Sequence, residues 1–202
     1  MKMYQKLNVP ELPLIQKELL EYINRYPDDV FDESATSEYC HSVGIKDFPI
    51  LSGFLLPRLK LPLQYINILI VPPVSNFNIH LDGNNELHQK VVITIPIKNY
   101  EESVTHWYDH KDIKEEYIWS KFCANDKPPY NGYTINFIKE EIVLQPIAST
   151  TVDKVTLMRA DWYHGVENSM NENRIVIVIR CGDTMMDKNV SFEDLMEFRD
   201  LI

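Results

Sequence analysis

The residues best suited to chemistry lie in the stretch Asn76–Gly83, NFNIHLDG. Successive side chains of a β-strand point to opposite faces, so alternation places Asn78, His80 and Asp82 on one face of this segment. The other face is apolar, and a turn signal begins at Gly83. An imidazole and a carboxylate two residues apart on one face of a strand can bind the same metal ion.

A second triplet of this form, His110-Lys111-Asp112, lies in the charged run DHKDIKEEY, which has no apolar alternation. We therefore expect His80 and Asp82, rather than His110 and Asp112, to bind a metal. The alternative for His80 is a buried histidine that is hydrogen-bonded within the core and binds nothing.

A distant stretch, Trp162–Arg180, carries a further imidazole at His164. Together with His80 and Asp82 it completes a set of two histidines and one carboxylate. Such a set leaves one side of an octahedral metal open, and it is the ligand arrangement of non-haem Fe(II) oxygenases.

The same stretch ends in the strand-like sequence RIVIVIR. Its isoleucines alternate with Arg174 and Arg180, which share the opposite face. A buried arginine is costly without an anion, and its guanidinium suits a carboxylate. Arg174, ten residues beyond His164, is the first candidate for an anion site, and Arg180 is its competitor. Either arginine could instead lie in solvent at a sheet edge.

His80-x-Asp82, His164 and Arg174 together resemble the signature of the 2-oxoglutarate- and Fe(II)-dependent dioxygenases. The phrase HGVENSMNENR resembles the distal block of the prolyl- and aspartyl/asparaginyl-hydroxylase-like members of that family, and the match spans residues 50–182. The resemblance implies a double-stranded β-helix with Fe(II) held by the three ligands. It also implies that Arg174 pairs with the distal carboxylate of 2-oxoglutarate. Dioxygen would be consumed, and a small molecule, an amino acid or a protein side chain would be hydroxylated.

Short runs rich in Val, Ile and Thr recur at near-regular spacing from Tyr65 onward. This pattern predicts a mainly β protein, either a sandwich or a jelly-roll barrel. The family resemblance implies the double-stranded β-helix (jelly-roll, cupin-like) form. The expected strands are 65–71, 76–82, 91–97, 104–108, 133–138, 141–145, 154–158 and 174–180.

A single domain, 1–202, is expected from the length of the chain. Apolar residues at helical spacing predict a helix over about residues 13–25, within a helical N-terminal support, 1–60. The β-helix core should cover 61–182, and a capping-box-like start at Ser191 predicts a C-terminal helix within 190–202.

The segment 109–131 interrupts the strand pattern as an insertion that is first charged and then aromatic. It could form the rim of a site, or a helical surface insertion whose aromatic residues pack inward. Strand alternation makes Asn78, Thr94 and Trp107 candidates for lining a pocket, with ordinary packing as the alternative for each.

The net charge of −10 argues against broad binding to nucleic acid or to anionic membranes. The three cysteines have no metal-type spacing and suggest free thiols in a reducing compartment. No apolar run approaches the length of a membrane span, and no signal peptide is evident, so we expect a cytoplasmic protein.

Two other function classes remain open from the sequence. One is a cupin-like metalloenzyme that uses another divalent metal and no 2-oxoglutarate, although Arg174 would then have no evident purpose. The other is a non-catalytic β-barrel binding protein. Titration with Fe(II) and 2-oxoglutarate distinguishes the three classes.

Overall fold

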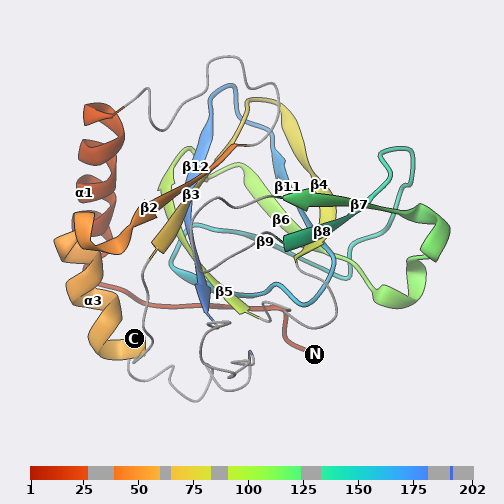
Figure 1. The fold of residues 1–202 in the computed structure, drawn as a ribbon, viewed down its shortest axis with the longest axis horizontal. Helices are drawn as coiled ribbons and strands as arrows, with labels where there is room; N and C mark the ends of the chain where they lie inside the picture. Colours follow the sequence, from red (N-terminus) through yellow and green to blue (C-terminus); the bar gives the residue numbers. More distant parts are fainter. Residues whose placement is uncertain (27–38, 60–64, 83–90, 124–132, 182–191, 193–202) are drawn as a thin grey trace.

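The protein folds into two facing antiparallel sheets (Figure 1). The computed structural model describes residues 1–26, 39–59, 65–82, 91–123, 133–181 and 192. Each sheet contains six strands among these residues. This is the mainly β, double-stranded β-helix (jelly-roll, cupin-like) architecture, so the predicted fold class is confirmed.

One sheet, called the larger sheet because its strands contain slightly more residues, has the strand order β1-β10-β5-β12-β3-β2. Its strands are β1 (Tyr4–Lys6), β2 (Tyr39–Gly44), β3 (Tyr65–Val71), β5 (Val91–Lys98), β10 (Thr156–Arg159) and β12 (Arg174–Cys181). The smaller sheet has the order β7-β8-β4-β11-β6-β9. Its strands are β4 (Ser75–Asp82), β6 (Ser103–Trp107), β7 (Ile118–Cys123), β8 (Tyr133–Ile138), β9 (Ala148–Thr151) and β11 (His164–Asn168).

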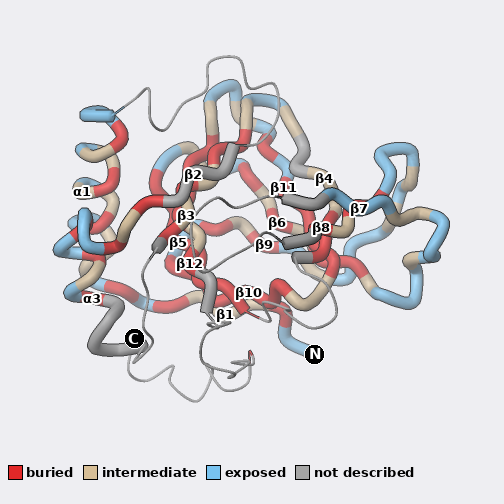
Figure 2. The backbone as a smooth tube through the Cα atoms, viewed as in Figure 1, coloured by how far each residue is buried: buried red, intermediate tan, exposed pale blue. Residues whose placement is uncertain are grey.

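Two helices, α1 (Leu12–Arg25) and α3 (Pro49–Leu59), cover the outer face of the larger sheet (Figure 1). The buried stripe of α1 and the isoleucines of β12 belong to one hydrophobic core, which explains why every second residue of β12 is an isoleucine. The members shared by these two elements are Ile15, Leu19, Ile23, Ile175, Ile177 and Ile179. Burial is concentrated in the strands and on the inner sides of the helices (Figure 2).

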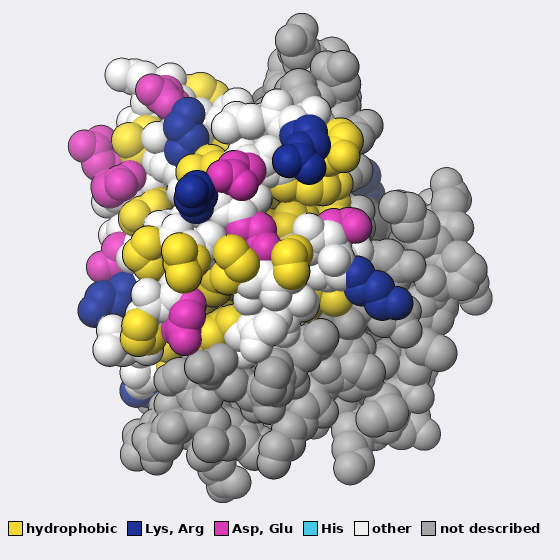
Figure 3. Space-filling model, turned by 90° about the vertical axis from the view of Figure 1, so that its left-hand side faces the viewer, with side chains coloured by type: hydrophobic (Ala, Val, Ile, Leu, Met, Phe, Trp, Pro, Cys, Tyr) yellow, Lys and Arg dark blue, Asp and Glu magenta, His cyan; other side chains and the backbone are white. Residues whose placement is uncertain are grey.

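The opposite side of the helices faces solvent, where hydrophobic side chains lie among charged ones (Figure 3). Among the described residues, no helix is both long and apolar enough to cross a membrane. Three short 3-10 turns, Ile45–Asp47, His110–Asp112 and Glu115–Tyr117, complete the elements.

Several sequence expectations need correction. The region 1–60, expected as helical support, also supplies β1 and β2 to the larger sheet. The strand expected at 141–145 is wrong. Its alternation is real, because Ile142 and Leu144 pack on a buried cluster while Val143 is 86% exposed, but residues 142–146 have no regular secondary structure. The following segment forms β9 instead.

The insertion 109–131 contains no α-helix in its described part. It contains two 3-10 turns and then β7, which pairs with β8. The expected C-terminal helix, 190–202, lies outside the described residues apart from Phe192, which is buried.

Candidate functional site

A row of ring-bearing side chains crosses the smaller sheet. Residues directly opposite one another on neighbouring strands share a face, and the strand register gives the order Trp119, Phe137, His80, His164 and Trp107. Trp107 packs in one cluster with Val92 and Met158 of the larger sheet. The row therefore faces the space between the two sheets.

His80 and His164 lie side by side in this row. Their ring centroids are 4.3 Å apart, and both residues are buried. Nδ1 of His80 lies 2.9 Å from the carbonyl of Asn78, and Nδ1 of His164 lies 2.8 Å from the carbonyl of Trp162. A carbonyl oxygen can only accept, so each Nδ1 carries a hydrogen, and in the neutral tautomer this places the lone pair of the ring on Nε2.

This geometry fits two histidine ligands of one metal ion. With metal–nitrogen bonds of about 2.1 Å, two imidazoles bound at right angles place their ring centroids about 4.5 Å apart. A backbone carbonyl that fixes the tautomer through Nδ1 is also the usual partner of a metal-binding histidine.

The third predicted ligand, Asp82, follows His80 on the same strand and with the same alternation. Its backbone pairs with Ile135 of β8, and its side chain lies outside the described residues. Within the described part of the chain no group of three metal-binding side chains is found. The structure thus brings together two of the three predicted ligands.

Arg174 is a buried cation at the start of β12. It is 2% exposed, and its Nε and Nη1 have no hydrogen-bond partner among the described residues. Burial lowers the pKa of Arg174 to about 10, so the guanidinium is still charged at neutral pH. The neighbouring Ile175 faces the helices, and alternation directs Arg174 to the inner side of the sheet.

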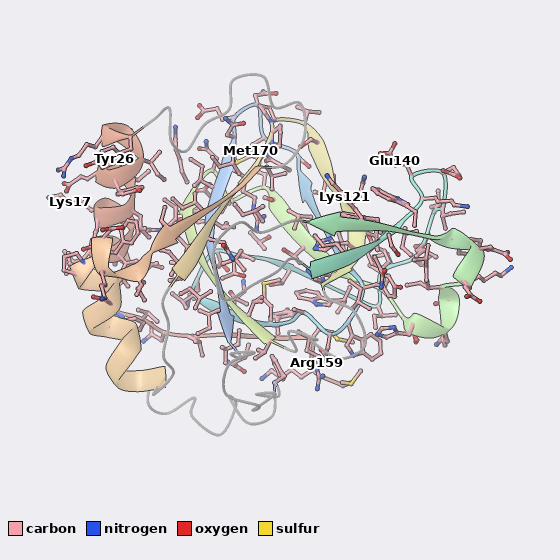
Figure 4. All side chains as sticks on the ribbon, in the orientation of Figure 1. Lys17, Tyr26, Lys121, Glu140, Arg159 and Met170 are labelled. Atoms are coloured by element: carbon pink, nitrogen blue, oxygen red, sulfur yellow. The ribbon has the colours of Figure 1, made fainter. Side chains whose placement is uncertain are left out.

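Asn168 fixes the turn that joins β11 to β12. Its amide nitrogen donates to the carbonyls of Val71, Pro72 and Glu172 at 3.0, 2.8 and 3.0 Å. Its amide oxygen accepts from the backbone of Met170, which Figure 4 labels at this turn. Asn168 therefore fixes the turn that lies between His164 and Arg174.

The other residues singled out in the sequence have different environments. Thr94 is buried and donates its hydroxyl to Met158 Sδ at 3.2 Å. Trp107 is fully buried, stacks on Tyr4 and donates Nε1 to the carbonyl of Arg159. Both side chains thus fill the interior, which is the packing alternative.

The two remaining candidates are Asn78 and Arg180. Asn78 is partly exposed and donates its amide to Glu140 at 3.2 Å. Arg180 pairs through its backbone with Val92, and its side chain lies outside the described residues.

The competing triplet, His110-Lys111-Asp112, lies on a 3-10 turn and not on a strand. His110 is exposed on a 3-10 turn, and its ring packs against Trp162 and Tyr163. It shares no strand face with Asp112, because both belong to that turn.

One residue was missed by the sequence reasoning. The hydroxyl of Thr105 is buried and has no hydrogen-bond partner among the described residues. Thr105 lies on β6 two residues before Trp107 and so shares its inner face. The same alternation that selected Trp107 would have identified it.

Comparisons with known proteins give distant structural likenesses only. No protein-family model matches the chain, and no curated protein matches it. The non-haem α-ketoglutarate-dependent carbocyclase SnoK of nogalamycin biosynthesis is 16% identical with a TM-score of 0.47, covering 88% of this chain and 78% of SnoK. E. coli ycfD is 11% identical with a TM-score of 0.42, covering 77% and 38% of the two chains. Vicilin from hazelnut, Corylus avellana, is 10% identical with a TM-score of 0.36, covering 72% and 28%.

The chain thus spans well under half of the ycfD and vicilin chains. No activity follows from these likenesses.

Proposed function

We propose that this chain is a non-haem Fe(II)- and 2-oxoglutarate-dependent dioxygenase that hydroxylates a small molecule, an amino acid or a protein side chain. The observation that carries the proposal is Arg174, a charged side chain that is buried without a partner for Nε or Nη1 among the described residues. A guanidinium in this state calls for an anion, because an unpaired buried charge is costly. It faces the same space between the sheets as His80 and His164.

The histidine pair supports the metal part of the proposal. Nε2 of His80 and Nε2 of His164 would hold Fe(II), with the carboxylate of Asp82 as the third ligand. When bound, iron and 2-oxoglutarate supply the oxidising power that inserts one atom of dioxygen into a substrate C–H bond.

The protein's own groups then bind and orient the cosubstrate. Arg174 would pair with the distal carboxylate of 2-oxoglutarate, since a guanidinium offers two parallel N–H donors to a carboxylate. The Thr105 hydroxyl, also buried without a partner among the described residues, is proposed as a second donor to this carboxylate. The hydrogen bonds of Asn168 keep the turn between the metal site and Arg174 fixed.

Anaerobic titration tests the function directly. Fe(II) should bind first, and 2-oxoglutarate should then produce a weak visible charge-transfer band. Tight metal binding without 2-oxoglutarate binding would favour a cupin-like enzyme of another reaction type. Failure to bind metal at all would favour a non-catalytic binding protein.

A further inference from the structure

Trp119, on edge strand β7, is an exposed aromatic residue next to the histidine pair. Its indole stacks on Phe137 with centroids 4.7 Å apart and an interplanar angle of 18°. Phe137 in turn contacts the ring of His80 at 5.8 Å. Although one indole face is covered, Trp119 remains 41% exposed.

Exposure of a single large apolar residue is common and needs no explanation by itself. Leu14 and Val143 are more exposed than Trp119, but neither belongs to the row of rings. Trp119 differs because it ends a continuous series of ring contacts that leads to His80. A planar group placed on its open side would extend this series toward solvent.

Lys121 adds a charge to the same edge. It lies two residues after Trp119 on β7, so the two side chains share a face about 7 Å apart. Lys121 is opposite Ile135, which is also the partner of Asp82, so its row adjoins the row of His80. Its side chain is exposed and forms no ion pair within the described part of the chain (Figure 4).

We infer that Trp119 and Lys121 form the substrate-recognition edge of the proposed dioxygenase, and that its substrate is an aromatic anion. The ring of the substrate would stack on Trp119, and its anionic group would pair with Lys121. Trp119 alone would also accept a cation, but the positive charge of Lys121 on the same face disfavours one. The inference rests on the proposed function, because it names the substrate class of that site.

Matched probes separate the two contacts. Indole-3-acetate carries a ring and an anion, tryptamine carries the same ring with a cation, and cyclohexylacetate carries the anion without an aromatic ring. Binding of each is measured by calorimetry under anaerobic conditions with Fe(II) and saturating 2-oxoglutarate present. Indole-3-acetate should bind at least about tenfold more tightly than either of the others.

Two substitutions assign the contacts. Trp119→Ala should weaken indole-3-acetate binding by about tenfold or more, while Trp119→Phe should restore most of it. Lys121→Gln should weaken it by about two- to fivefold and reduce the preference over tryptamine. Tyr26→Ala, at an aromatic residue that is 42% exposed on another face, and Lys139→Gln, at an exposed lysine, should change nothing.

The outcomes distinguish this inference from the function on which it rests. Equal binding of tryptamine and indole-3-acetate, or no effect of Trp119→Ala, overturns the inference even if Fe(II) and 2-oxoglutarate bind. Loss of indole-3-acetate binding in Arg174→Leu but not in Trp119→Ala also overturns it, because the probe would then occupy the cosubstrate site. If 2-oxoglutarate does not bind but indole-3-acetate binding depends on both β7 residues, the recognition edge stands and the proposed reaction fails.

Discussion

The two His-x-Asp triplets have different surroundings in the fold. The ring of His80 is buried against that of His164, whereas His110 is exposed on a 3-10 turn. His80→Ala or His164→Ala should therefore abolish Fe(II) binding, and His110→Ala should leave it unchanged. Anaerobic calorimetry with Fe(II) measures this. Loss of the metal in His110→Ala with retention in His80→Ala would show that the wrong triplet was chosen.

Replacing Arg174 with leucine should not lower the stability of the ligand-free protein. Replacing a buried charge that has no protein partner with an apolar side chain removes the cost of its desolvation, so the change should be neutral or stabilising. Arg174→Leu should thus keep or raise the Tm of the ligand-free protein in a thermal melt.

Arg159 provides the matched control for Arg174. It is also buried, but it forms an ion pair with Asp161 at 3.0 Å. Arg159→Leu should destabilise the protein by about 1–3 kcal/mol, because it leaves hydrogen-bonding groups without a partner. An equal loss of stability in Arg174→Leu would mean that Arg174 has a protein partner and needs no ligand.

Single residues were predictable where alternation selected a face. It placed His80 and Arg174 on the inner faces of β4 and β12. Strand alternation could not reveal the exposure of Trp119, because that exposure depends on β7 lying at the edge of its sheet. Nor could it show that Trp107 is used in packing, because the partner of its indole nitrogen comes from a distant strand.

At the scale of elements, the turn between β11 and β12 depends on Asn168. Asn168→Asp keeps the size of the side chain but removes its donors, so three carbonyls lose a partner. We expect a loss of about 1–3 kcal/mol in the free energy of unfolding, measured by urea denaturation. Asn171→Asp, at an exposed position in the same turn, serves as the control. Equal effects of the two changes would remove Asn168 from its orienting role.

Strand β7 should exchange its amide hydrogens faster than β5. It is an edge strand with an exposed surface, whereas β5 is central and almost fully buried. Protection of β7 should increase when indole-3-acetate binds. Exchange in β7 as slow as in β5 without any ligand would instead identify a fixed packing element.

Elements with a strong local pattern were predicted, and those that depend on distant partners were not. The helix expected at 13–25 matches α1, and the strand expected at 133–138 matches β8. Helix α3 was missed because its sequence PILSGFLLPRL contains two prolines and a glycine. Strand β1 has three residues, too few for a period to be detected, and only its pairing with β10 defines it.

At the scale of the whole molecule, the proposed site forms only because the two sheets pack face to face. The smaller sheet supplies the histidine pair, and the larger sheet supplies Arg174. The resemblance to a known enzyme family implies this arrangement of the site, whereas the spacing of the strands alone predicted a sandwich or a jelly-roll barrel. The charge of the chain, −10, did not indicate the local cation at Lys121.

The most direct test of the central claim is the affinity of 2-oxoglutarate for the wild-type protein, Arg174→Leu and Arg180→Leu, each with Fe(II) under anaerobic conditions. Removing one partner of a buried charge-assisted pair typically costs about 2–5 kcal/mol, and about 1.4 kcal/mol corresponds to a tenfold change. Arg174→Leu should therefore weaken 2-oxoglutarate binding by roughly 30- to several-thousand-fold, with the affinity for Fe(II) unchanged. Arg180→Leu should have little effect. A large loss in Arg180→Leu alone would assign the anchor to the wrong arginine, and unchanged 2-oxoglutarate binding in both variants would contradict the account.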